Sequence, residues 1–254
     1  MTDRPEPLQK ILLRHTEDLL FPRRCPVCDR PVRPFGADIC PECAPKLEKI
    51  HGPVCRKCGK MLPDEREEYC TDCSRNRHLF SSGVSTFTYR SASGAIYRYK
   101  YEGRQEYAGF FSRAMAERLG MQIREGTLAV PGLLLPVPLS RERMKKRGYN
   151  QAALLAEGIS RMTGIPWDGN TLRRGINTLP MKNMSFADRR SNLKKAFNVY
   201  GIDVKSKMIM VIDDIYTTGA TADACTEVLL RAGAAYVSFM TLAIGIQSGN
   251  PGYD

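Results

Sequence analysis

The sequence predicts an α/β protein with a mainly parallel sheet, preceded by a small metal-binding module. Strand-like apolar segments alternate with helix-like amphipathic segments in the larger, C-terminal part of the chain. Four CxxC pairs precede that part, and the composition changes near residue 80. The chain has 254 residues, which is enough for one medium domain and one small module. We therefore expect a metal-binding module over residues 25–78 and an α/β domain over residues 80–248.

The segment before the first cysteine pair, residues 1–24, is expected to form a short amphipathic helix. Five residues recur in it at helical spacing: Leu8, Ile11, Leu12, His15 and Leu19. Arg14 interrupts the apolar stretch, which argues against a signal peptide. No apolar run approaches the roughly 20 residues that a membrane-spanning helix needs. These features favour a cytoplasmic protein without membrane insertion.

Eight of the nine cysteines form four CxxC pairs, with eleven residues between each pair and the next. Both sulfurs of a CxxC turn can point at one metal ion, and a second pair then completes the tetrahedron that structural zinc requires. A disulfide framework is the alternative, and the missing signal peptide argues against it. The pairs are CPVC at 25–28, CPEC at 40–43, CRKC at 55–58 and CTDC at 70–73.

Equal spacing alone permits either a serial or a cross-braced pairing of the four turns. The side chains favour the serial pairing, because Val32 corresponds to Leu62 and CPEC to CTDC at an offset of 30 residues. We therefore assign four cysteines to each of two Zn2+ ions: Cys25, Cys28, Cys40 and Cys43 to the first, and Cys55, Cys58, Cys70 and Cys73 to the second. Four thiolates leave no open position, so both sites are expected to be structural. His51 and His78 are expected to be bystanders.

The chain is basic, with a formal net charge of +11. Two Zn(Cys)4 sites of about −2 each would lower this value to about +7. A basic protein favours phosphate-bearing partners, which include both nucleic acids and small phosphorylated metabolites. Lysine and arginine are concentrated at 141–147 and 189–195. The alternative for these clusters is a solvated surface, but five basic residues within seven positions exceed what solubility needs.

The α/β domain is expected to contain four strands and four longer helices. The expected strands are 84–89, 133–138, 208–212 and 236–245, and the expected helices are 93–101, 105–119, 151–162 and 220–232. Gly120, Gly164 and Gly233 are expected to end three of the helices. The segment 171–195 carries seven basic residues and is expected to form a mobile loop and a short helix. Cys225 fits a small buried position in the last helix.

The segment VIDDIYTTGAT, residues 211–221, combines two acids at the end of an expected strand with a turn that enters a helix. Backbone N–H groups at a helix N-terminus bind phosphate, and threonine hydroxyls add donors. The acids can accept hydrogen bonds from vicinal hydroxyls or orient hydrated Mg2+. A ribose 5-phosphate satisfies both parts, whereas the alternative is a strand that merely ends in acids. The predicted binding residues are Asp213, Asp214, Thr217, Thr218, Gly219, Ala220 and Thr221.

The same segment closely resembles the ribose-phosphate loop of type I phosphoribosyltransferases, which bind 5-phosphoribosyl 1-diphosphate (PRPP) with Mg2+. Four other segments resemble, in order, segments of the ComF/ComFC competence proteins: LLFPRRCPVC, RYKYEGRQEYA, LPVPLSRERMKKRGYNQ and RRSNLKKAF. The resemblance implies a double zinc ribbon followed by a type I phosphoribosyltransferase-like domain. It departs at Met181, where the family usually has a glutamine, and mildly at Tyr149, where it has a phenylalanine.

The resemblance implies a protein that handles incoming single-stranded DNA in natural transformation, with DNA-uptake proteins as further partners. Arg143, Lys146 and Arg147 would contact either the diphosphate of PRPP or a nucleic-acid backbone. Four tyrosines are candidates for stacking on bases: Tyr97, Tyr99, Tyr101 and Tyr149. The alternatives are an active phosphoribosyltransferase of nucleotide salvage and a protein-docking adaptor. No catalytic residue is assigned, because no segment resembles the base-recognising part of a salvage enzyme.

Overall fold

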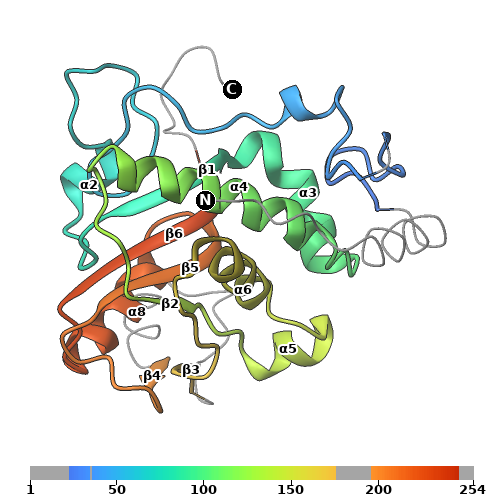
Figure 1. Cartoon of the computed structure of the whole chain (residues 1–254). Coiled ribbons are helices and arrows are strands. Elements are labelled where there is room, and N and C mark those ends of the chain that lie inside the picture. Colours follow the sequence, from blue (N-terminus) through green and yellow to red (C-terminus); the bar gives the residue numbers. More distant parts are fainter. Residues whose placement is uncertain (1–22, 35, 176–195, 246–254) are drawn as a thin grey trace, which may run out of the picture.

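A four-stranded parallel sheet forms the centre of the protein in the computed structural model, which describes residues 23–34, 36–175 and 196–245 (Figure 1). Its strand order is β1-β6-β5-β2, and all three neighbouring pairs are parallel. The strands are β1 (Gly83–Thr88), β2 (Leu133–Pro136), β5 (Met208–Tyr216) and β6 (Tyr236–Ile244). The predicted α/β fold with a mainly parallel sheet is therefore confirmed.

Three helices pack on one face of this sheet (Figure 1). They are α3 (Tyr89–Tyr101), α4 (Tyr107–Arg124) and α6 (Gln151–Thr163). Their apolar side chains meet Leu134, Met210 and Met240 from three neighbouring strands. Since alternate residues of a strand point to opposite faces, Leu135, Val211 and Phe239 belong to the core on the other face. There α8 (Ala220–Arg231) covers the sheet.

Most element boundaries lie within a few residues of those predicted. One strand and one helix are longer than predicted. The strand expected over 208–212 continues to Tyr216, because β5 keeps its pairing with β6 as far as the Tyr216–Ile244 register. The helix expected to stop before Gly120 continues as α4 to Arg124. A single glycine weakens a helix by only about 1 kcal/mol, which tertiary packing overrides.

Three short elements in the described part of the α/β domain were not predicted. Helix α5 (Arg141–Arg147) begins after Ser140, whose hydroxyl accepts a 3.3 Å hydrogen bond from the N–H of Arg143, and ends at Gly148 with a φ of 78°. Its capping residues, not an apolar period, define it. Strand β3 (Leu172–Arg174) pairs with β4 (Phe197–Val199) in a separate antiparallel sheet. The predicted loop and helix between them lie mostly outside the described residues, as does the predicted N-terminal helix.

The two cysteine modules lie apart from each other and have different neighbours (Figure 1). The first contains the short helix η1 (Ala44–Lys46) and lies beside α3, and its buried residues form a small cluster of their own. The second contains α2 (Thr71–Arg75), and its buried residues Cys55, Cys58 and Cys70 belong to the core that includes Phe239 of the sheet. The second module is thus continuous with the α/β core. Within the described part of the chain, no helix is both long enough and apolar enough to cross a membrane.

Candidate functional site

The eight CxxC cysteines form two separate groups of four thiols. Within each group the sulfur atoms lie within 4.8 Å of one another. The Sγ–Sγ distances are 4.0 Å between Cys28 and Cys40 and 3.6 Å between Cys58 and Cys70. Tetrahedral zinc with Zn–S bonds of about 2.3 Å separates its sulfur ligands by roughly 3.8 Å. Both groups therefore fit zinc, and the predicted serial pairing is confirmed.

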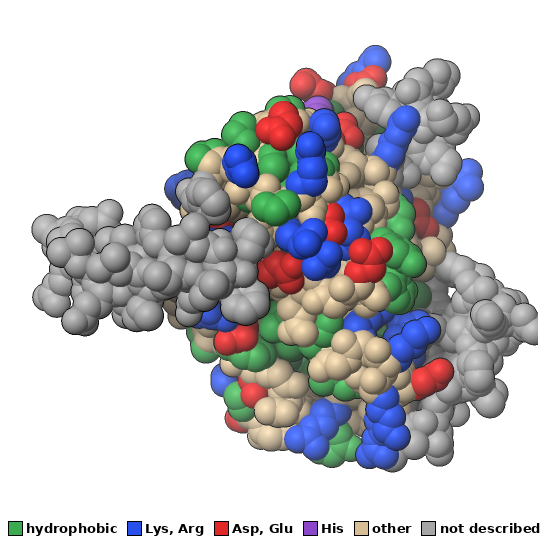
Figure 2. All heavy atoms as spheres, turned by 90° about the vertical axis from the view of Figure 1, so that its right-hand side faces the viewer, with side chains coloured by type: hydrophobic (Ala, Val, Ile, Leu, Met, Phe, Trp, Pro, Cys, Tyr) green, Lys and Arg blue, Asp and Glu red, His purple; other side chains and the backbone are tan. Residues whose placement is uncertain are grey.

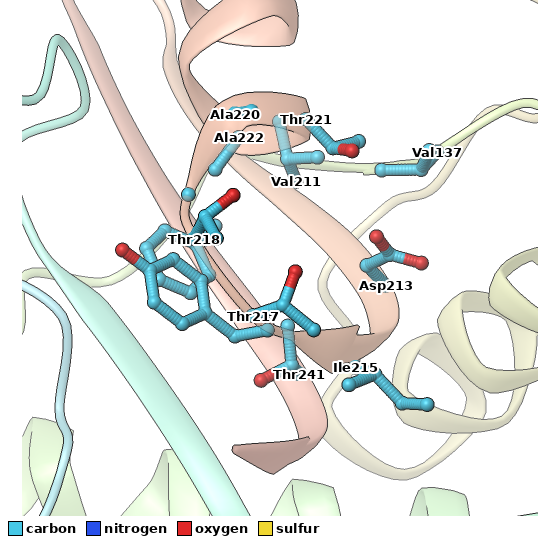
Figure 3. A pocket seen from close by; sticks show the side chains of 13 residues that line it. Val137, Val211, Asp213, Ile215, Thr217, Thr218, Ala220, Thr221, Ala222 and Thr241 are labelled. Atoms are coloured by element: carbon cyan, nitrogen blue, oxygen red, sulfur yellow. The ribbon is translucent and has the colours of Figure 1, made fainter. Parts of the chain in front are cut away.

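A cavity of about 380 Å³ lies between the end of β5 and the beginning of α8. Figure 3 shows the side chains of Asp213, Thr217, Thr218 and Thr221 around this opening. Gly219 and Ala220 also line it. The structure thus brings together six of the seven residues that the sequence assigned to a ribose-phosphate site. The apolar part of the wall includes Val137, Val211 and Phe239.

The loop at this cavity presents backbone N–H groups that find no acceptor among the residues that the structure describes. In the described part of the chain, the first amide of this region with a backbone acceptor is that of Asp223, which donates to the carbonyl of Gly219 at 2.8 Å. The amides of residues 218–222 donate to no protein acceptor among the described residues. Gly219 adopts a φ of 73°, and no side chain caps the helix. The arrangement suits an anion, because the free amides and the helix dipole act in the same direction.

The two adjacent aspartates point to opposite faces of the sheet. Asp213 follows Val211 on the cavity side. Asp214 is not among the cavity's lining residues, and its Oδ1 lies 2.7 Å from the Nζ of Lys100 on α3. The sequence led us to expect both carboxylates beside the ligand, on the assumption that the strand ended before them. Because β5 includes both residues, the alternation of a strand separates them.

The carboxyl group of Asp213 has an unusual affinity for protons. Burial and the nearby charge of Asp214 raise its pKa to about 7, although the N–H of Asp214 and the charges of Lys100 and Arg143 oppose the shift. At neutral pH this group can therefore exist in both protonation states. Its charged form can accept hydrogen bonds from hydroxyl groups or contact a hydrated cation.

A second cavity, of about 400 Å³, lies between α3 and α5, and we call it the α3–α5 groove. Its lining residues are Lys100, Tyr101, Gly103, Glu142, Arg143, Lys146 and Arg147. The three basic residues predicted to contact diphosphate or nucleic acid are thus together. In the side view of Figure 2, lysine and arginine side chains gather at the lower end of the face, the side on which Figure 1 shows α5.

The four tyrosines considered for base stacking differ in exposure. Tyr97 and Tyr101 are exposed, whereas Tyr99 and Tyr149 are buried. The hydroxyl of Tyr99 donates to the carbonyl of Gln151 at 3.0 Å, and that of Tyr149 donates to the carbonyl of Tyr99. Only the two exposed rings can meet a partner. The second predicted basic cluster, 189–195, and the family departure at position 181 lie outside the described residues.

Sequence reasoning missed the roles of Lys100 and His78. Lys100 joins the groove to the acid pair through Asp214. His78 is no metal ligand among the described residues, but its Nδ1 lies 2.9 Å from Oδ2 of Asp223 in the first turn of α8. The N–H of Leu79 donates to the other oxygen of Asp223 at 2.7 Å. No local pattern signals these contacts, because the partners are more than 100 residues apart.

Solved structures that match part of this chain include phosphoribosyltransferases, all at low similarity. The glutamine PRPP amidotransferase from Bacillus subtilis has a TM-score of 0.36 and 19% identity, covering 57% of this chain and 30% of that one. The purine phosphoribosyltransferase from Pyrococcus horikoshii has a TM-score of 0.34 and 17% identity, covering 56% of this chain and 80% of that one. Likeness at this level carries no argument about activity.

Sequence comparisons are more informative. The double zinc ribbon family model matches residues 16–74. The chain is 33% identical to the DNA utilization protein YhgH of Escherichia coli K12 over 150 residues, which are 59% of this chain and 66% of that protein. It spans 64% of the YhgH of Salmonella typhi, slightly less than two thirds.

Two competence proteins are matched over more of their length. The chain is 30% identical over 183 residues to competence protein F of Haemophilus influenzae, covering 69% of this chain and 78% of that one. It is 30% identical over 191 residues to ComFC of Bacillus subtilis, covering 71% of this chain and 74% of that one. With its two four-cysteine sites and its parallel α/β domain, the chain belongs to the ComF family of competence proteins.

Proposed function

We propose that this chain handles incoming single-stranded DNA in natural transformation and binds a ribose 5-phosphate group, in the form of PRPP with Mg2+. The observation that supports the ligand assignment is that the amides of residues 218–222, which have no acceptor among the described residues, lie beside Asp213 in one cavity. The names of the relatives, competence protein F, ComFC and DNA utilization protein, support the DNA role. The basic α3–α5 groove supports it as well.

In this proposal the amides of the loop and the hydroxyls of Thr218 and Thr221 hold the 5-phosphate. Asp213, in its charged form, accepts hydrogen bonds from the ribose hydroxyls. A hydrated Mg2+ suits this donor set, since magnesium commonly binds through one or two carboxylates together with ligand phosphates and water. Bound Mg2+ would offset the negative charge of the diphosphate. Asp214 contributes indirectly, through its ion pair with Lys100.

Calorimetry with three probes tests the ligand: inorganic phosphate, ribose 5-phosphate and PRPP, each with Mg2+. We expect affinity to rise along this series in the wild type. Asp213→Asn should abolish the gain from phosphate to ribose 5-phosphate, because it removes the acceptor for the hydroxyls. Thr221→Val should weaken all three. Asp203→Asn, a change of an exposed aspartate outside the cavity, is the control. Equal affinity of the wild type for phosphate and ribose 5-phosphate would refute the assignment.

Binding of labelled single-stranded DNA to the zinc-loaded chain, measured across a salt series, tests the second role. Affinity should fall as salt rises, because each phosphate contact releases counterions. Absence of binding at low salt would remove the DNA role. Four-thiolate zinc sites also favour a reducing compartment, so we propose a cytoplasmic location, with DNA-uptake proteins as partners. Cell fractionation that found the chain outside the cytoplasm would contradict this location.

An active phosphoribosyltransferase of nucleotide salvage is the second candidate. The observation that favours it is electrostatic: the positive charges of Lys100 and Arg143 oppose the rise in the pKa of Asp213, and the same charges would stabilise a departing diphosphate. Release of diphosphate from PRPP in the presence of purine or pyrimidine bases would distinguish an enzyme from a binding protein. Binding of PRPP without release of its diphosphate in the presence of any tested base would exclude the transferase reaction for those bases.

A further inference from the structure

We propose that the exposed rings of Tyr97 and Tyr101 form a stacking surface for the bases of single-stranded DNA, whose phosphates lie along the α3–α5 groove. The inference rests on the proposed DNA role and deepens it, because it names the surface and the part of the DNA that each side chain contacts. The surface lies on α3 and α5, on the opposite side of the acid pair from the ribose-phosphate cavity.

The two rings form an exposed aromatic pair. Tyr97 and Tyr101 are one helical turn apart on α3, and their ring centroids are 5.1 Å apart with planes tilted by 47°. They are 57% and 59% exposed. Other aromatic residues of this region, such as Tyr99 and Tyr107, are buried in the core. The exposed pair therefore has no packing role comparable with theirs, and more than half of each residue's surface is open to a ligand.

Basic side chains border the same pair. The guanidinium of Arg147 lies over the ring of Tyr101, 5.0 Å from its centroid. Arg143 and Lys146 line the groove with it, and Glu142 is the one acidic residue in the lining. The charge of Lys100 is already matched by Asp214 at 2.7 Å. Three cations thus remain for backbone phosphates, directly beside two rings that can stack on bases.

This combination selects single-stranded DNA over other polyanions. A duplex already stacks its bases internally, so exposed tyrosines would add little to its affinity. An acidic peptide would use the cations of the groove but has no bases to place on the rings. The groove is linked to the ribose-phosphate cavity through the acid pair, because Lys100 lines the groove and forms an ion pair with Asp214, the neighbour of Asp213.

The test compares two labelled probes of equal length, an oligothymidylate and an abasic oligodeoxynucleotide, with the zinc-loaded full chain. Both probes carry the same phosphates, so the ratio of their affinities isolates the bases. The main variant is Tyr97→Ala/Tyr101→Ala, and the conservative variant Tyr97→Phe/Tyr101→Phe keeps both rings. Tyr200→Ala is the matched control, because Tyr200 is 52% exposed and lies under Arg173 at 5.4 Å, on a different part of the chain.

We expect the wild type to prefer the oligothymidylate by about 5- to 150-fold for each base stacked. The double alanine variant should bring the ratio close to one while binding of the abasic probe stays unchanged. The phenylalanine variant and Tyr200→Ala should keep the wild-type ratio. Arg147→Ala should weaken both probes and make binding less dependent on salt, because it removes a phosphate contact.

Three results would overturn the inference. The first two would leave the proposed DNA role intact, and the third would refute that role as well. If the wild type binds DNA but the alanine variant keeps its preference for bases, or Tyr200→Ala loses as much, only the stacking surface is wrong. If an oligoglutamate peptide binds the wild type and loses as much affinity in the alanine variant, the rings serve an acidic peptide instead. If the wild type binds neither DNA probe at low salt, the DNA role itself fails.

Discussion

Loss of zinc from the second site should unfold the α/β domain, whereas loss from the first should leave the sheet folded. The matched changes are Cys58→Ser/Cys70→Ser in the second site and Cys28→Ser/Cys40→Ser in the first. Each removes one cysteine from each of the two CxxC turns that share an ion. The expected difference comes from what surrounds each group of thiols, since the two groups have the same ligands.

The second site is built into the main core. Cys58 and Cys70 are fully buried and belong to the cluster that contains Phe80 and Phe239. The site approaches the sheet so closely that a Cβ on Gly59, next to Cys58, would lie 2.6 Å from the carbonyl oxygen of Gly83 on β1. Apparent zinc-binding free energies of about 10–16 kcal/mol are as large as the whole stability of a typical domain, about 5–15 kcal/mol. Loss of this ion therefore removes enough free energy to unfold the core.

The first site has its own small cluster and is attached to the rest by polar contacts and by the partly buried side chains of Val27 and Ile39. Asp29 accepts hydrogen bonds from Tyr107 at 2.6 Å and from Arg104 at 2.8 Å, and Arg98 donates to the carbonyl of Val27 at 2.7 Å. Hydrogen bonds to charged groups contribute roughly 1.5–3 kcal/mol each. Three such bonds amount to about 4.5–9 kcal/mol, which is less than the zinc-binding free energy of the second site. Loss of the first site therefore lowers the melting temperature substantially but leaves the sheet and its helices to fold.

Zinc content and thermal melting measure the difference. Both variants should hold one zinc ion per chain, measured with a chromogenic chelator, in place of two. The first-site variant should keep a cooperative far-UV circular dichroism transition, and the second-site variant should have none at 25 °C. Equal transitions in the two variants, or loss of the transition only in the first-site variant, would refute this account of the core.

Three further predictions concern the site. Gly219→Ala should destabilise the chain more than Gly164→Ala in a denaturant titration. Both glycines have a φ of 73°, a conformation that costs alanine about 1–2 kcal/mol, but of the two only Gly219 has atoms within 3 Å of the added Cβ. Lys100→Met should cost about 3–5 kcal/mol by leaving the largely buried Asp214 unpaired, and adding Asp214→Asn should recover part of it. The pKa of Asp213 is raised to about 7 in the folded state, so its carboxyl group makes the stability of the wild type fall as the pH rises from about 4 to about 7. The melting temperature of Asp213→Asn relative to that of the wild type should therefore increase from pH 5 to pH 8. A difference in melting temperature that stays constant over this range would contradict the prediction.

The sequence was sufficient for the architecture because each part has a strong local signal. Four CxxC turns at regular spacing predicted the two metal sites, and the offset of 30 residues predicted which turns pair. Apolar runs such as 208–212 predicted buried parallel strands. Helix α5 has no such signal: its seven residues are mostly charged, and only the capping serine and glycine at its ends mark it. Periodicity cannot detect a helix without an apolar face.

The candidate site was predictable in composition but not in geometry. The loop residues and Asp213 were identified correctly as neighbours, since they are adjacent in the sequence. The direction of Asp214 depended on where β5 ends, and strand ends are the least certain part of a sequence-based prediction. A strand that continued by four residues beyond the expected end turned one carboxylate toward α3. Its partner, Lys100, could be found only from the packed structure.

The second zinc ribbon and the loop that leads into α8 are parts of one continuous packing unit. Asp72 lies between two ligands of the second ion, and its Oδ2 is 3.5 Å from Nε2 of His78. His78 in turn contacts Asp223 at the start of α8, and a Cβ on Gly219 would lie 2.7 Å from the imidazole ring. The turn that exposes the free amides is therefore packed directly against a residue positioned by the ribbon. Because the imidazole leaves no room for a side chain at Gly219, the ribbon helps to define the shape of the loop as well as the core.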